Sequence, residues 1–466
     1  MILQACLISF IIEKVFLDKE KRKNMAVFFK GAFMLIGVAF IGECIEFLTN
    51  MVLANELGAH GMGLYMSILP AIFLIVTIAS MELPISISKF VAEKEEKYHR
   101  DMLRFTIRLA SLFVLLLMAA VALLLPALPI FHHYHPYLRW LIIALIPMIA
   151  FSSIARGYFM GVQQMGKIAA ANFLRKMMQL ILLVLLFHWM EFDVQMSIFI
   201  AICTLVGSDL IVLLYLFHMF VLQMRTLKKK EQAPMGGKEI RRSLLSVSLS
   251  TTGMRVFHAV TNAIEPFFIK WVLLKSGMTE GMANEHFGLV AGVAFTIGFF
   301  PAFIAHSLST VLIPTVSEAY AKRDGIKLQK LLQQVMMMTF LYGLPAVIVI
   351  QVFSVPLTTL FSHSAAAAVY VRLLWPYFLF HYFVIPMQAF LIGLGLVRDA
   401  LAHFIWSTMV TYCLIYYLGS NPQYQMAGVI IAMNTGTLLI MMMHYLTICK
   451  KIEISLILRK SMKHTF

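Results

Sequence analysis

The chain has 466 residues, of which 61% are hydrophobic and 13% charged, with a formal net charge of +15. Soluble domains are about half apolar and about a quarter charged. This composition therefore excludes a soluble protein and predicts an all-α, polytopic membrane protein. The positive charge does not predict a nucleic-acid partner, because it is confined to segments between long apolar runs.

The first segment, residues 1–24, carries a short apolar run followed by charges. The run is too short to cross a bilayer and lacks a clear small-residue cleavage site, so we predict no secretory signal. We predict a cytoplasmic surface segment here. A start of the chain at Met25 is an equally weighted alternative.

Twelve apolar segments follow, each long enough to cross a hydrocarbon core of about 30 Å as a helix. Their approximate bounds are 27–53, 62–88, 103–126, 138–160, 168–190, 195–223, 245–272, 287–314, 330–357, 367–393, 399–418 and 425–449.

The only strongly polar, Pro- and Gly-containing linker lies at 225–242 and divides these segments evenly. We therefore predict an N-terminal six-helix lobe at 25–224 and a C-terminal six-helix lobe at 243–450, with a basic tail at 451–466. An even number of spans makes both halves enter the membrane in the same direction, as in parallel-repeat transporters. The predicted fold is thus two six-helix lobes around a central cavity.

Nearly all of the 38 lysines and arginines fall on one side of this predicted topology. Cytoplasmic loops of membrane proteins carry such an excess of Lys and Arg. We therefore predict that both termini and the linker 225–242 are cytoplasmic, in a cytoplasmic membrane. The tail and loops also predict contact with anionic membrane lipids.

The first span carries Glu43, Glu46 and Asn50, spaced three and four residues apart, which places them on one helical face. Two carboxylates one turn apart repel each other when ionised, and burial favours their neutral form. We therefore predict that Glu43 and Glu46 bind a coupling proton or Na⁺, with Glu265 as a further member. Asn50 is predicted to line the cavity. A static pairing of these glutamates with Arg255 is the alternative.

Two motifs in the middle of the first half resemble ligand sites but predict neither a metal nor a cofactor. Residues 131–137 contain His132, His133 and His135, and we favour an interfacial histidine and aromatic belt over a zinc site. Residues 161–168 nearly match a phosphate-binding loop, yet Ile168 stands where Ser or Thr would bind magnesium.

The sixth span contains Asp209, which we weigh equally as an ion-coupling residue and as a satisfied packing residue. His306 and His381 are interpreted as core histidines. Two Gly-x3-Gly spacings, at 157–161 and 288–292, predict close helix packing.

The seventh span carries the strongest pattern, because Thr251, Arg255, His258, Asn262 and Glu265 step by four, three, four and three. This spacing makes one continuous polar face. A charge at the bilayer centre costs about 2.5–3.5 kcal/mol on insertion scales, so such a face avoids lipid. We predict that it lines the cavity, with an internal Arg255–glutamate pair as the alternative.

Four stretches together resemble one known family: ELPISISKFVAEK (82–94), RGYFMGVQQMGK (156–167), IEPFF (264–268) and SLSTVLIPTVSEA (307–319). They are similar to the sporulation branch of the polysaccharide-transporter group, in the multidrug/oligosaccharidyl-lipid/polysaccharide exporter superfamily. The resemblance covers about residues 25–450. It implies alternating access, a lipid-linked oligosaccharide as substrate, and work in spore envelope assembly, with the forespore membrane as one location.

The predicted function is therefore a flippase-like transporter of lipid-linked saccharide, with no catalytic residues. A cation-coupled multidrug-type exporter is the alternative that the acidic first span would suit. A non-transporting scaffold for envelope synthesis is a further alternative. A membrane glycosyl ligase is disfavoured because the longest outer loop, at about 273–286, is too small for a catalytic domain.

Overall fold

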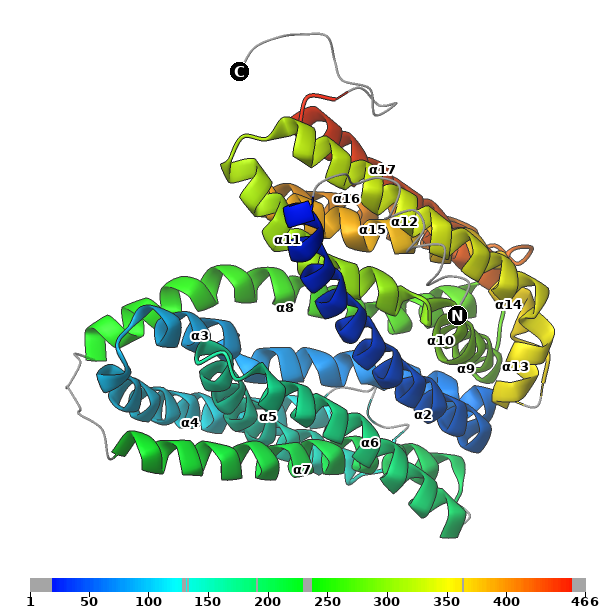
Figure 1. The fold of residues 1–466 in the computed structure, drawn as a ribbon. Coiled ribbons are helices and arrows are strands. Elements are labelled where there is room, and N and C mark those ends of the chain that lie inside the picture. The colour runs from blue at the N-terminus through cyan, green and yellow to red at the C-terminus, as the bar shows by residue number, and fades with distance from the viewer. Residues whose placement is uncertain are drawn as a thin grey trace.

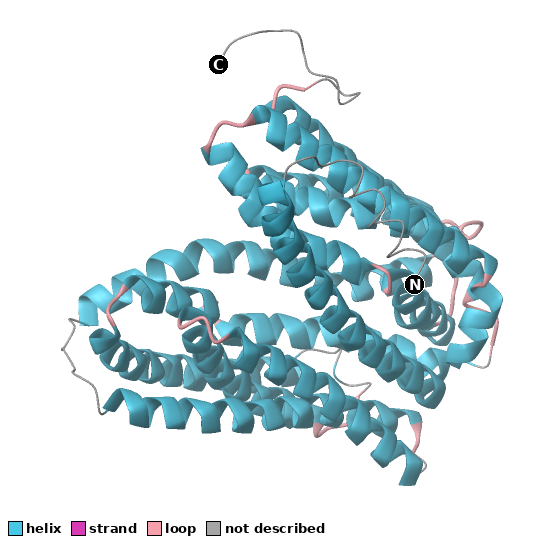
Figure 2. Ribbon diagram, in the orientation of Figure 1, coloured by secondary structure: helices cyan, strands magenta, loops and turns pink. Residues whose placement is uncertain are grey.

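A computed structural model of the protein consists of helices joined by loops, with no β-strand in the part of the chain that it describes (Figure 2). The described residues are 19–127, 131, 134–189, 192–228, 237–362 and 364–454. Their side chains are described too, except those of 19–36, 38, 237–252 and 254. The predicted terminal segments therefore lie mostly outside the described residues, as do His132, His133 and the side chain of Thr251.

The described residues of the first half of the chain form six α-helices and two short 3₁₀ turns. They are α2 (Lys19–Ser80), α3 (Leu83–Glu93), η1 (Glu96–Tyr98), α4 (His99–Leu124), η2 (Leu125–Ala127), α5 (Leu138–Gly161), α6 (Met165–Trp189) and α7 (Val194–Lys228).

The second half contains long helices interrupted by short ones. They are α8 (Gly237–Lys275), α9 (Glu280–Gly288), the π-helix η4 (Leu289–Ala294), α10 (Phe295–Phe299), α11 (Ala302–Ala321), α12 (Gly325–Val352), α13 (Ser354–Ser362), α14 (Ala368–Leu373), α15 (Trp375–Gly393), α16 (Val397–Gly419) and α17 (Gln425–Lys451).

Nine helices of the described chain are long and apolar enough to cross a membrane, or ten if the bent pair 280–299 and 302–321 counts as one span. This result confirms a polytopic all-α membrane protein, while the number of twelve stays a prediction. The helix α2 is counted once although Gly58, with φ 63° and ψ −179°, breaks it. Only glycine adopts this conformation readily, so Gly58 divides α2 into the first and second predicted spans.

The helices gather into two lobes (Figure 1). Helices α3 to α7 form one lobe, against which α2 packs through α5, α6 and α7, and α11, α12 and α15 to α17 pack with one another. Helix α8 and the first half of α2 run between the two groups. Helices α7 and α8 extend through residue 228 and from residue 237, so part of the predicted linker 225–242 is helical.

Three clusters of buried apolar side chains show where the lobes are joined. One cluster, which includes Phe90, belongs to the N-terminal lobe alone, and another, which includes Phe390, belongs to the C-terminal lobe alone. The third combines side chains of both lobes, such as Ile68 and Val290. The lobes therefore share a core at one end and have separate cores at the other, where Figure 1 shows them diverging.

The shared end is held by an unusually close approach of backbones. A Cβ atom placed on Gly63 of α2 would lie 1.9 Å from the carbonyl oxygen of Asn284 in α9. A Cβ atom on Gly288 would lie 2.1 Å from the carbonyl oxygen of Ala59. We call Ala59, Gly63 and Gly288 the glycine seam. It confirms the close packing predicted for the 288–292 spacing.

The other Gly-x3-Gly spacing packs α5 against α3. A Cβ atom on Gly157 would meet Ile87 at 2.9 Å, and one on Gly161 would meet Val91 at 2.6 Å. Close packing is therefore confirmed here as well. It holds α3 tightly in the N-terminal lobe, directly after a break in the helix that precedes it.

The predicted outer loop at 273–286 is wrong in its extent, because α9 begins at Glu280. Thr279 caps this helix, its side chain accepting a hydrogen bond from the backbone N–H of Met282 at 3.3 Å. A side-chain cap of this kind stabilises the first turn of a helix. The loop between α8 and α9 is therefore even shorter than the predicted loop.

Candidate functional site

A groove of about 470 Å³ lies between the second half of α2 and the helix α8, with one contribution from α15. It is lined by Pro70, Phe73, Thr77, Arg255, His258, Ala259, Asn262 and Gln388. Its position between the lobes follows from its walls, since α2 belongs to the N-terminal lobe and α15 to the C-terminal lobe.

Three residues of the polar face predicted on α8 line this groove together: Arg255, His258 and Asn262. The His258 ring lies against Phe404 of α16, with ring centroids 3.7 Å apart. Glu265 does not line the groove. It is half-buried and lies near Tyr377 and Tyr412.

The partner of Arg255 is Glu82, at the break between α2 and α3, with Nη1 and Oε1 2.7 Å apart. The side chain of Arg255 is 58% exposed and that of Glu82 only 3%. The predicted alternative of an Arg255–glutamate pair therefore has a basis, although Glu82 takes the place of Glu43 and Glu46. The sequence offers one sign of this role, because Glu82 is a single acidic residue between an apolar run and the pair Leu83-Pro84.

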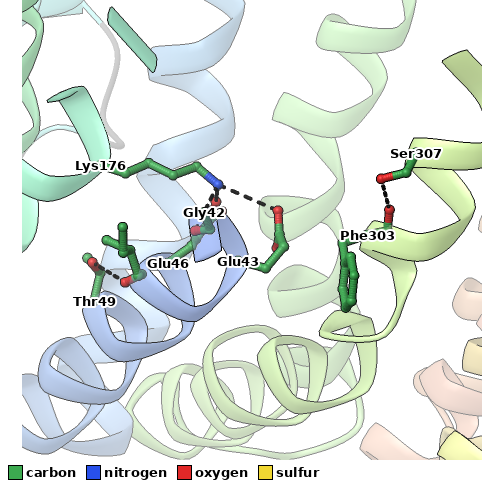
Figure 3. Close-up of polar contacts among 8 residues, drawn as sticks. Gly42, Glu43, Glu46, Thr49, Lys176, Phe303 and Ser307 are labelled. Carbon is green, nitrogen blue, oxygen red and sulfur yellow. Dashed lines mark hydrogen bonds and ion pairs between the residues drawn. The ribbon is translucent and has the colours of Figure 1, made fainter. Parts of the chain in front are cut away.

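Glu43 and Glu46 meet a lysine of α6 instead (Figure 3). Lys176 Nζ lies 2.7 Å from Glu46 Oε2 and 3.5 Å from Glu43 Oε1, and it donates to the carbonyl oxygen of Gly42 at 3.2 Å. Lys176 falls inside the predicted span 168–190, so the N-terminal lobe also carries a basic residue within a span.

Asp209 on α7 is not isolated, because Arg156 on α5 and Arg175 on α6 lie near it. Arg156 Nη1 also donates to Asn172 Oδ1 at 2.6 Å. This arrangement supports the packing interpretation of Asp209, since its opposite charges come from two neighbouring helices of the same lobe. Asn50 is half-buried and does not line the groove.

No group of three or more His, Cys, Asp or Glu residues that could hold a metal ion occurs in the described part of the chain. His135 is described but packs against aromatic rings, with its centroid 4.7 Å from that of Phe199 and 5.3 Å from that of Tyr137. These contacts fit the predicted aromatic belt.

A family model described as polysaccharide biosynthesis protein matches residues 28–319, more than half of the chain. This chain belongs to the polysaccharide biosynthesis protein family. A second model, described as MatE, matches residues 290–416. The resemblance inferred from the four sequence stretches is thereby confirmed.

Two proteins of Bacillus subtilis (strain 168) align with most of this chain. Sporulation protein YkvU is 52% identical over 431 residues, covering 92% of this chain and 97% of the relative. Stage V sporulation protein B is 30% identical over 446 residues, covering 92% and 85%.

Solved structures share the fold at low identity. An inward-facing multidrug resistance MATE family transporter of the MOP superfamily gives a TM-score of 0.71 at 16% identity, covering 88% of this chain and 94% of that one. An outward-facing structure of such a transporter gives 0.63 at 17% identity, covering 91% and 96%. Together these comparisons give the family and the fold of this multi-pass membrane protein, a fold that it shares with MATE family transporters.

Proposed function

We propose that this protein moves a lipid-linked saccharide, or a similar cell-envelope precursor, across the cytoplasmic membrane during spore envelope assembly. The observation that carries the proposal is Arg255, which stands 58% exposed in a groove between two lobes. A guanidinium keeps its charge and can hold a phosphate through two parallel hydrogen bonds. The pyrophosphate of a lipid-linked sugar is the matching ligand.

The arrangement of the lobes supports alternating access. The lobes share a core at one end only, so the groove can open at the other end without breaking either separate core. The positive-inside rule assigns the diverging end to the cytoplasm, together with both termini. The names of the two Bacillus relatives support a role in sporulation and, with it, the forespore membrane as a location.

A reconstituted assay tests the proposal directly. The purified protein is placed in liposomes that carry a fluorescent polyprenyl-linked sugar in one leaflet, and the label that crosses is quenched by a membrane-impermeant reagent. We expect label to cross faster than in protein-free liposomes. Equal rates, with folded protein present, would contradict a flippase role and favour the scaffold alternative.

A cation-coupled exporter of small amphipathic cations remains the second candidate. The exposed carboxylate of Glu46 and the multidrug transporters among the fold neighbours favour it. The same liposomes separate the two candidates, because an exporter would accumulate a fluorescent cation in response to a proton or Na⁺ gradient. A flippase of anionic lipid would leave that dye unaffected.

The groove predicts a pattern of aqueous access along α8. Single cysteines that replace groove residues are expected to react with a water-soluble thiol reagent, whereas positions off the groove are expected to react little, because they face packed helices or lipid. The reactive groove positions are 258 and 262, position 251 is expected to react with them from its helical spacing alone, and the unreactive positions are 256, 260 and 263. Ala263 is buried and serves as the strictest control. Equal labelling of both sets in a version without native cysteines would mean that this face does not line water.

Glu43 and Glu46 remain our proposed site for a coupling proton or Na⁺, with Lys176 as their counter-charge. We expect Glu46→Gln to keep normal protein levels while transport loses its dependence on the ion gradient, because the amide keeps size and hydrogen bonding but cannot titrate. The measurement is transport at two gradients together with protein abundance. Glu56→Gln, an exposed change on the same helix, is the control.

A static ion pair would give a different result. Glu46→Gln and Lys176→Met would then both lower the melting temperature, since each leaves a charge with a weakened partner. Unchanged gradient dependence in an abundant Glu46→Gln protein would remove this residue from the coupling site. The same comparison applies to Glu43→Gln and to Glu265, our further proposed member of that site, and it decides between ion coupling and packing for Asp209.

A further inference from the structure

The break between α2 and α3 carries a buried acid whose role the proposed transport does not explain. Met81 and Glu82 both have positive φ, 48° and 51°, a conformation that residues other than glycine rarely adopt. Pro84 follows within the first turn of α3. Irregular backbone inside membrane spans is tolerated where it lines a cavity or is buried in protein. The strained turn directs the Glu82 carboxylate into the protein, where its side chain is 3% exposed.

The two carboxylate oxygens of Glu82 are satisfied unequally. Oε1 pairs with Arg255 at 2.7 Å, whereas Oε2 is buried and has no hydrogen-bond partner among the described residues. A buried carboxylate is normally bonded through both oxygens. The charge of Glu82 therefore depends on Arg255, and one oxygen is free to carry a proton.

Arg255, in contrast to the buried Glu82, is accessible, because its side chain is 58% exposed and lines the groove. A ligand that enters the groove can reach the guanidinium but not the carboxylate behind it. An anionic ligand therefore competes with Glu82 for one cation.

We propose that Glu82 takes up a proton when a pyrophosphate-bearing ligand binds Arg255, so that anion and proton are loaded together. This inference rests on the proposed function and adds to it a proton site linked to the ligand, at Glu82, separate from the coupling site proposed at Glu43 and Glu46. Moving the guanidinium onto the phosphate would leave a buried carboxylate without a counter-charge, which is costly. Protonation at the free oxygen removes that cost.

Neighbouring charges do not substitute for Arg255. Helices α5 and α8 pack against α3, which begins at this break. Of the basic groups Arg156, Arg255 and His258 on these two helices, Arg255 is the one that pairs with Glu82 in the described structure. Arg156 donates to Asn172, and the His258 ring lies against Phe404. On α3 itself, Lys89 and Glu93 form an exposed pair 3.8 Å apart.

The exchange also affects the contact between the lobes. Glu82 belongs to the N-terminal lobe and Arg255 to α8, which runs between the lobes and also packs with α16 and α17, so their ion pair ties α8 to the N-terminal lobe beside the groove. Ligand binding would replace this tie with a contact between Arg255 and the ligand. Loading would thereby favour movement of one lobe relative to the other, as alternating access requires.

Calorimetry with the purified full-length chain in lipid nanodiscs tests the inference. The probe is farnesyl pyrophosphate, with farnesol as the uncharged control. Titrations in two buffers of different ionisation enthalpy give the number of protons taken up per bound probe. At about pH 8 the probe itself is largely ionised, because the second pKa of a phosphate is near 6.

We expect the wild-type protein to take up about one proton per bound probe, and Glu82→Gln to take up none while binding about tenfold more tightly, because no carboxylate competes for Arg255. Glu93→Gln, an exposed change on the same helix, should behave as wild type. Binding by the wild type without proton uptake, or uptake that persists in Glu82→Gln, would overturn the inference.

The two proposals fail in different ways. Absence of probe binding by the wild-type protein would contradict the proposed function itself, whereas binding without linked protons contradicts only the inference. If Glu82→Gln does not fold, the pH dependence of probe binding by the wild-type protein still tests the inference. Its affinity for the probe should rise as the pH falls, by up to about tenfold per pH unit, and a pH-independent affinity would contradict the role of Glu82.

Discussion

Replacing Arg255 with glutamine is expected to reduce transport of a lipid-linked saccharide by about 100-fold or more. A hydrogen bond between charged groups contributes about 1.5–3 kcal/mol, and a bidentate contact with phosphate contributes two of them. Glutamine keeps much of the length of arginine but carries no charge. Transport is measured in liposomes, and membrane insertion by fractionation and by the yield of monodisperse protein in detergent.

The single change also orphans Glu82, so a loss of stability could mimic a loss of function. Breaking a buried ion pair by removing one partner costs about 3–5 kcal/mol, whereas replacing both partners costs far less. We therefore expect the double variant Glu82→Gln/Arg255→Gln to regain the melting temperature that Arg255→Gln loses. It should still fail to transport, because the cation for the phosphate is absent.

Arg398→Gln is the matched control, since Arg398 is exposed at the start of α16 and lies outside the groove. Its transport and melting temperature should equal those of the wild type. A stable double variant that transports at the wild-type rate would show that Arg255 does not bind substrate. A double variant as unstable as Arg255→Gln would instead point to further contacts of the guanidinium.

The polar face of α8 was predictable because a single helix fixes the positions of its own residues. Spacings of three and four place Arg255, His258 and Asn262 on one side, whatever the rest of the chain does. The groove that they line agrees with that prediction. Glu265, one further step along the helix, follows the same spacing but lies outside the lining, because the groove ends before it.

The partners of these charges could not be predicted, because they depend on tertiary structure. Glu82 reaches Arg255 through a helix break that no periodicity describes. Lys176 lies 133 residues from Glu43 in sequence and reaches it along a side chain that can extend several ångströms. Its position within the span 168–190 does not indicate which helix it faces.

Hydropathy predicts most of the membrane-spanning helices, but it does not predict where those helices are broken or bent. Apolar runs of sufficient length predict spanning helices from physical chemistry alone. The composition of residues 280–321 gives no sign of the π-helix η4 or of the bend of 59° between 280–299 and 302–321. Only the packing of α9 against α2 shows why this segment must be irregular and rich in glycine.

Gly288→Ala is expected to open the end of the molecule at which the lobes are joined. Its new Cβ atom would lie 2.1 Å from the carbonyl oxygen of Ala59 and 2.6 Å from the backbone nitrogen of Gly63. These are backbone atoms, so no side chain can rotate away and the two helices must separate. Overpacking costs about 1–3 kcal/mol, which shifts a two-state equilibrium about 5- to 150-fold away from the closed arrangement.

Gly281→Ala on the same helix separates this effect from helix propensity. A Cβ atom at Gly281 meets nothing within 4 Å, so the same substitution adds no clash there. Alanine favours the helix over glycine by about 0.5–1 kcal/mol at both positions. We therefore expect Gly281→Ala to keep transport and Gly288→Ala to lose it.

The position of the opening can be measured with a cysteine at position 262 in the groove. A membrane-impermeant thiol reagent, applied from the side opposite the basic loops, should label Asn262→Cys faster in the Gly288→Ala background than in the Gly281→Ala background. Gly63→Ala should act like Gly288→Ala, because it faces the carbonyl oxygen of Asn284 at 1.9 Å across the same seam. Identical labelling in all backgrounds would mean that the seam does not control access, and that its close packing serves only to join the lobes.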